Sequence, residues 1–116
     1  MVDLIEQYRE AASQHGLAKR AGNASATNDA HDRIILTLKK IDRADQNEDM
    51  FQLYDDDDVG VQAWAATHTL EVDEHRAEQK LKEISEMSIP LTSMAARLVL
   101  SEWASGALKP RRLIKG

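Results

Sequence analysis

Apolar residues recur at steps of three and four along most of the chain, a spacing that places them on one face of an α-helix. The first run begins at Leu4 and predicts a helix from about Asp3 to a stop at Gly16. A stripe of isoleucines and a leucine predicts a second, longer helix over residues 17–43, whose first half consists of small residues. Small side chains allow close approach, so we expect the first helix to pack against that half.

Four further helices are predicted in the rest of the chain. Each has a start signal, either a side chain that accepts hydrogen bonds from free backbone N–H groups or a proline in the first turn. These signals are Asn47, an aspartate of the run Asp55–Asp58, Asp73 and Pro90. The helices that they open span about residues 47–54, 59–70, 73–87 and 88–106.

These helices differ in the distribution of their apolar residues. Residues 59–70 and 88–106 are apolar on two opposite sides, which is typical of a helix buried between neighbours. Residues 73–87 are apolar along one stripe only, which is typical of an outer helix. The residues expected at the centre of the core are Trp64, Leu70, Leu81, Ile84, Leu98 and Trp103.

The sequence LYDDDDVGVQAWAA at residues 53–66, with Leu70, Leu81 and Ile84 after it, resembles a HEAT repeat. In that pattern an acidic turn precedes a Val- and Ala-rich inner helix, and an outer helix follows. The resemblance covers about residues 47–106, and the whole chain is similar to small bacterial HEAT-like proteins of unknown function. Such proteins supply an expected fold and no activity.

The resemblance and the helical pattern together predict an all-α fold, a short right-handed α-α superhelix of about six helices arranged as HEAT-like hairpins. Residues 1–107 are expected to form a single helical domain, and residues 108–116 a basic C-terminal tail. Stacked hairpins of this kind repeat with periods of roughly 30 to 47 residues.

Composition and charge narrow the function classes. The 116 residues are 42% hydrophobic and 30% charged, with a formal net charge of -5 and no cysteine. An acidic protein repels phosphate backbones, so we expect no nucleic-acid partner. The sequence has no apolar run of about 18 residues and no signal-peptide pattern, so no membrane partner is expected. The absence of cysteine suits a reducing cytoplasm.

The aspartate run invites a calcium hypothesis, because Asp55, Asp57 and Gly60 begin like the loop of an EF-hand. The pattern fails at its fifth position, Val59, and at its twelfth, Ala66, where a bidentate glutamate is required. We therefore interpret the run as a helix-capping turn.

His68, Glu71 and His75 are three residue types that bind zinc, within eight residues of one another. Their spacing would place two of them at the end of one helix and the third at the start of the next. We expect no metal, no cofactor and no catalytic residue here.

Asn28 and Asp32 lie one turn apart on the predicted second helix, and Arg97 projects from the otherwise apolar last helix. A buried carboxylate usually has a charged partner, so these three residues form a candidate polar site. The interpretation that they only pair with one another is favoured over ligand binding.

The function class that the sequence favours is a protein-protein interaction module with an acidic helical surface and a partner that is basic. The candidate partner-binding residues are Asp55, Asp56, Asp57, Arg111 and Arg112. The alternative is a small enzyme or metal-dependent binding protein that uses the polar cluster on the inner helices. The surplus apolar surface of the last helix also suggests a homodimer.

Overall fold

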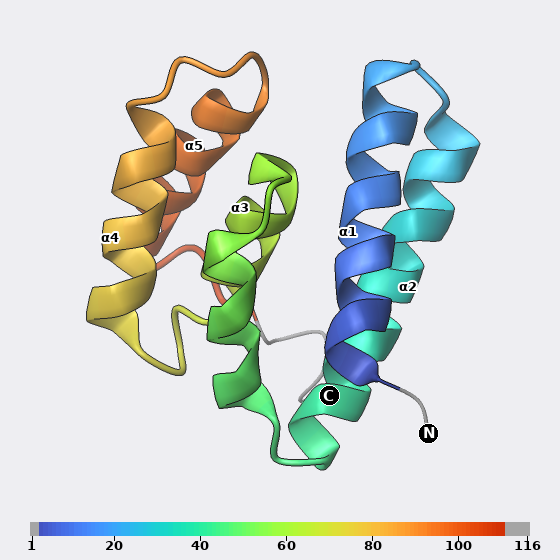
Figure 1. Cartoon of the computed structure of the whole chain (residues 1–116). Helices are drawn as coiled ribbons and strands as arrows, with labels where there is room; N and C mark the ends of the chain where they lie inside the picture. Colours follow the sequence, from blue (N-terminus) through green and yellow to red (C-terminus); the bar gives the residue numbers. More distant parts are fainter. Residues whose placement is uncertain (1–2, 111–116) are drawn as a thin grey trace. The chain divides into compact units, whose positions relative to one another are not determined.

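The computed structural model describes residues 3–110, and within that range the protein is all-α, as predicted, without any β-strand. The helices are α1 (Leu4–Arg20), α2 (Ala24–Arg43), the 3-10 helix η1 (Asn47–Asp55), α3 (Val59–His68), α4 (Glu74–Ser85) and α5 (Thr92–Ala104), as Figure 1 shows. Among the described residues, no helix combines the length and the apolar character that crossing a membrane requires.

The contacts divide the chain into two compact units, one ending at Met50 and the other beginning at Phe51. The first unit contains α1 and α2, and the second contains most of η1 together with α3, α4 and α5. The single domain over residues 1–107 stays a prediction. Most of the predicted basic tail, residues 111–116, lies outside the described residues.

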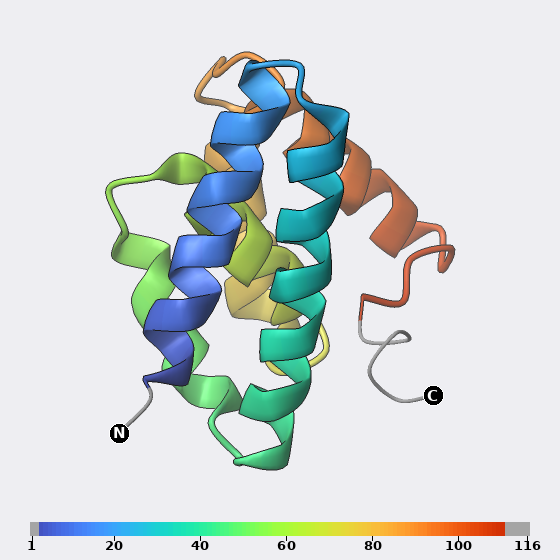
Figure 2. The same ribbon diagram turned by 90° about the vertical axis from the view of Figure 1, so that its right-hand side faces the viewer.

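In the first unit α1 and α2 lie side by side as a helical hairpin (Figure 2). The break between them falls at Gly22, whose φ of 70° is readily adopted only by glycine. The Asn23 side chain then caps α2 by accepting a hydrogen bond of 3.0 Å from the Ala26 N–H. The predicted stop at Gly16 and the predicted start at Leu17 are therefore wrong, because α1 continues through both to Arg20.

The two helices of the hairpin bury the residues that their spacing places on one face. From α1 these are Tyr8, Ala11 and Ala12, and from α2 they are Ala30, Ile34, Thr37, Leu38 and Ile41. The alanines of α1 allow close approach of the helices, while the large side chains of α2 supply most of the apolar volume.

In the second unit the predicted caps are confirmed for α3 and α4. Asp58 accepts from the Gly60 N–H at 2.9 Å, and Asp73 accepts from the Arg76 N–H at 3.2 Å. Helix α4 packs against both α3 and α5. Its predicted apolar stripe is buried, and consists of Ala77, Leu81 and Ile84.

The connection between α4 and α5 is held by a buried hydroxyl group. Ser93 donates to the Ile84 carbonyl at 2.7 Å and accepts from the Ile89 N–H at 2.8 Å, so it ties the end of α4 to the start of α5. The last helix was predicted to begin at residue 88. It begins at Thr92 instead, because Ser88 and Leu91 have positive φ angles of 59° and 66°.

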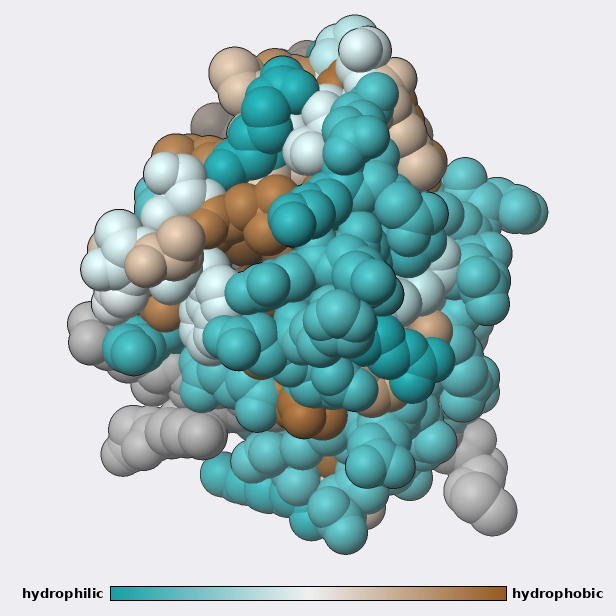
Figure 3. All heavy atoms as spheres, turned by 90° about the vertical axis from the view of Figure 1, so that its left-hand side faces the viewer, coloured by the Kyte–Doolittle hydropathy of each residue, from teal (hydrophilic) through white to brown (hydrophobic). Residues whose placement is uncertain are grey.

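The predicted core is confirmed in part. Leu70, Leu81 and Ile84 are buried, while Trp64 and Trp103 are half-buried. The prediction for Leu98 is wrong, since its side chain is 57% exposed. Helix α5 buries only Ser93 and Ala96, so it is not apolar and buried on both sides. Figure 3 shows hydrophobic residues that reach the surface between hydrophilic ones on the face it presents.

Candidate functional site

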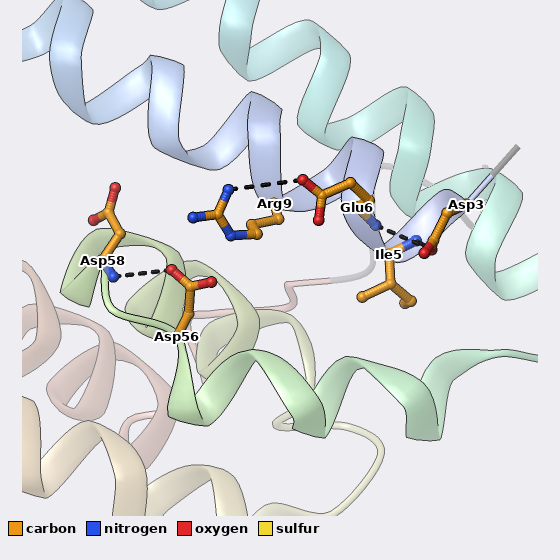
Figure 4. Close-up of polar contacts among 6 residues, drawn as sticks. All are labelled: Asp3, Ile5, Glu6, Arg9, Asp56 and Asp58. Carbon is orange, nitrogen blue, oxygen red and sulfur yellow. Dashed lines mark hydrogen bonds and ion pairs between the residues drawn. The ribbon is translucent and has the colours of Figure 1, made fainter.

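The aspartate run forms a tight turn between η1 and α3 (Figure 4). The Asp56 carboxylate accepts from the Asp58 N–H at 2.9 Å, and the Asp58 carboxylate caps α3 at Gly60. The Gln62 side chain donates to the Asp56 carbonyl at 2.6 Å and closes the turn from the helix side. Two of the four aspartates thus have structural roles, as a capping turn requires.

The remaining two, Asp55 and Asp57, are exposed. They belong to an acidic segment that we define as residues 42–58, which holds eight acids and one base, Arg43. Six of these acids are exposed, namely Asp42, Asp45, Glu48, Asp49, Asp55 and Asp57. Along the chain, the segment concentrates negative charge between the end of α2 and the start of α3. Helix capping accounts for only part of this charge, because Asp58 alone caps α3.

The predicted polar site is distributed over both units. Asn28 and Asp32 are exposed on α2, and Arg97 is exposed on α5. The Arg97 guanidinium donates to the Ser85 carbonyl at 2.7 Å, where it satisfies the free C-terminal end of α4. This bond gives Arg97 a structural role within the second unit, and the grouping with Asn28 and Asp32 stays a prediction.

His68, Glu71 and His75 lie in different environments. His68 is buried at the end of α3, with its ring 5.5 Å from the Trp64 ring, whereas Glu71 and His75 are exposed. Within residues 3–110, no three side chains of the types His, Cys, Asp and Glu are grouped so as to hold a metal ion. Arg111 and Arg112 fall outside those residues.

Two histidines of the hairpin face each other across α1 and α2. The rings of His15 and His31 are 6.5 Å apart between centroids. Burial lowers the pKa of His15, and electrostatic interaction with the neighbouring Lys19 and His31 lowers it further. His15 lies inside α1, which extends five residues beyond it.

Sequence reasoning missed a cluster of aromatic and cationic side chains between η1 and α4. Phe51 and Tyr54 meet edge to face at 5.3 Å, and the Arg76 guanidinium lies 4.1 Å from the centroid of the Phe51 ring. The Lys80 ammonium lies 5.9 Å from the Tyr54 ring. The available signal was the spacing of Arg76 and Lys80, which places both on one face of α4.

A second missed feature joins α5 to α4. The indole N–H of Trp103 donates to the Glu74 carboxylate at 2.9 Å and to the Glu78 carboxylate at 3.1 Å. The two acids stand one turn apart on α4, so a single donor reaches both. Trp103 therefore fixes the C-terminal half of α5 through a polar bond as well as through packing.

The most apolar exposed surface lies at the α4–α5 turn and along α5. Among the described residues, four of the six large hydrophobic side chains that are exposed belong to residues 87–98. These are Met87 at 43%, Leu91 at 47%, Met94 at 59% and Leu98 at 57% exposure. Met94 and Leu98 lie one turn apart on α5, whereas Met87 and Leu91 belong to the turn that precedes the helix.

Over residues 3–110, the fold and these surfaces define an all-α protein with an acidic and an apolar exposed region. No protein-family model, no curated protein and no solved structure matches the chain significantly.

Proposed function

We propose that this protein is a protein-protein interaction module that binds a basic partner through its acidic segment, residues 42–58. The observation that supports it most directly is the exposure of six of the eight acids in that segment, against a single base. Complementary charge steers such a partner toward the surface and disfavours acidic ones.

Asp55 and Asp57 are the residues that we assign to partner contact within this segment. They project from a turn that Asp56 and Asp58 hold through their own hydrogen bonds, so the two exposed carboxylates stand on a fixed backbone. A turn whose backbone is already ordered loses less conformational freedom on binding than a mobile loop does.

The test is co-purification from a lysate of the native source, with proteins identified by mass spectrometry. A double variant, Asp55→Asn with Asp57→Asn, is compared with the matched control Glu10→Gln with Asp29→Asn, which removes the same charge from exposed positions elsewhere. We expect a reproducible basic partner that the control retains and the first variant loses. If both double variants retain the partner equally, Asp55 and Asp57 do not contact it and the proposal that the acidic segment binds the partner is wrong.

For the architecture we propose HEAT-like hairpins that stack as a right-handed α-α superhelix. We also propose that the protein is bacterial and lies in the cytoplasm. Support comes from the pairwise packing of consecutive helices, α1 with α2, α3 with α4 and α4 with α5. The lack of cysteine supports the location. A crystal structure tests the stacking through the handedness of successive hairpins.

A further inference from the structure

We infer that His15 and His31 form a binding site for a divalent transition-metal ion between α1 and α2. The two side chains come from different helices of the first unit, His15 from α1 and His31 from α2, and their ring centroids are 6.5 Å apart. Neither belongs to the acidic segment, residues 42–58, so this inference and the proposed function stand independently of each other.

The distance between the two rings fits one shared ion. A ring nitrogen lies about 1.2 Å from the ring centroid and about 2.0 to 2.1 Å from a bound Zn²⁺, so each centroid lies about 3.2 Å from the ion. Two rings on opposite sides of the ion then have centroids about 6.4 Å apart, and two rings at the tetrahedral angle about 5.2 Å apart. The observed 6.5 Å is close to the first value. Rotation of the two half-buried side chains about their χ angles can bring the rings toward the second.

The chemistry of the two side chains also fits such an ion. Neutral imidazole is a preferred ligand of Zn²⁺, Cu²⁺ and Ni²⁺. Rings stacked face to face could not direct their in-plane lone pairs at one ion, but these rings are inclined by 54° to each other. Each ring has a second nitrogen, which can keep a contact within the protein while the first nitrogen binds the ion. Burial lowers the pKa of His15, which favours its neutral form.

Two imidazoles fill only part of the coordination shell of the ion. Most zinc sites have three or four protein ligands, whereas no third side chain of the types His, Cys, Asp and Glu joins this pair among residues 3–110. Water therefore completes the shell, and we expect a dissociation constant of about 1 to 100 μM. The positive charge of Lys19, one turn after His15, opposes a cation and also limits the affinity, although its exposed side chain can turn toward solvent.

The experiment is a titration of the full chain with ZnCl₂, followed by NMR spectroscopy of the histidine rings. The protein has four histidines, so the ring signals can be assigned from single variants. We expect the signals of His15 and His31 to shift together, with one dissociation constant, and those of His68 and His75 to stay in place. Excess EDTA is expected to reverse the shifts.

Matched variants test whether both rings bind the ion. His15→Gln and His31→Gln each remove one imidazole and are each expected to weaken Zn²⁺ binding about tenfold or more. His75→Gln is the control, because His75 is exposed in the second unit, and it is expected to bind Zn²⁺ as the wild type does. Circular dichroism of each variant checks that the helices are retained, and the titration of the wild type depends on no variant.

Three results would overturn the inference. The first is that the signals of His15 and His31 stay in place up to about 1 mM Zn²⁺, a concentration at which even a weak site is occupied. The second is a shift of only one of the two signals, because one histidine would then bind the ion alone. The third is a His15→Gln or His31→Gln variant that binds Zn²⁺ as tightly as the wild type, because the ion would then lie elsewhere in the chain.

Discussion

The hydroxyl groups of Tyr54 and Thr69 form a buried hydrogen bond between two side chains of the second unit. Their oxygens are 2.6 Å apart, and Thr69 also donates to the Ala65 carbonyl at 2.8 Å, so the proton between the two hydroxyls comes from Tyr54. Burial raises the pKa of Tyr54, which keeps the phenol neutral as this donor role requires.

Removing the Thr69 hydroxyl group should lower the free energy of unfolding more than removing the Tyr54 hydroxyl group. Tyr54→Phe removes the donor and is expected to lower the unfolding free energy by about 1 kcal/mol, because Thr69 keeps its bond to Ala65. Thr69→Val strands the buried phenol and is expected to cost about 2 to 3 kcal/mol. Urea denaturation of both variants and of the double variant measures the coupling, and equal costs with no coupling would contradict the bond.

His15 should make the stability of the protein depend on pH. Its pKa is lowered in the folded state, so the neutral imidazole favours folding and protonation favours unfolding. The contribution of the neutral His15 to the free energy of unfolding is fully present above the ordinary histidine pKa of about 6.5. It is lost progressively as the pH falls from that value to the lowered pKa of the folded state.

The measurement is the melting temperature of the wild type and of His15→Gln between about pH 8 and pH 5. The variant is expected to lose less stability over this interval than the wild type. His75→Gln is the matched control, because His75 is exposed at the start of α4. If the melting temperature of His15→Gln changes with pH as that of the wild type does, burial of His15 is not a source of the pH dependence of stability.

Among the helices, the boundary between α1 and α2 shows what the sequence could and could not predict. A glycine is a sound stop signal, and the sequence offers two candidates, Gly16 and Gly22. The decisive feature is Asn23, which follows Gly22 directly and caps the next helix. Glycine before a capping residue is a stronger boundary signal than glycine alone.

The two glycines should therefore respond in opposite directions to the same substitution. Gly22→Ala is expected to destabilise the protein by about 1 kcal/mol, because φ is 70° there. Gly16→Ala is expected to stabilise it by about 0.5 to 1 kcal/mol, since Gly16 lies inside α1. The added methyl would come within 3.3 Å only of the flexible end of Arg20. Urea denaturation gives both values, and the same sign for both would contradict the helix boundary.

Helix α5 shows the limit of periodicity. Apolar residues on two sides of a helix are expected when both sides are buried. The same spacing also occurs when one side is buried and the other is exposed, and the sequence alone does not distinguish the two cases. Met94 and Leu98 belong to the exposed side. The polar bonds of Trp103 and Arg97 to α4 join residues 12 to 29 positions apart, and no local pattern predicts such partners.

At the scale of the whole chain, the question is whether its two compact units unfold together. Each has its own buried aliphatic residues, with Leu38 fully buried in the first unit and Leu81 fully buried in the second. A contact-rich unit with its own core tends to open as a separate cooperative unit.

Hydrogen exchange of matched variants answers this question. Leu38→Ala and Leu81→Ala each remove the same buried side chain at a cost of about 2 to 5 kcal/mol. Leu38→Ala is expected to speed amide exchange in α1 and α2 and to leave α4 and α5 nearly unchanged, and Leu81→Ala is expected to do the reverse. If either variant speeds exchange equally throughout residues 3–110, the chain unfolds as one cooperative body, which is the behaviour that a single domain over residues 1–107 requires.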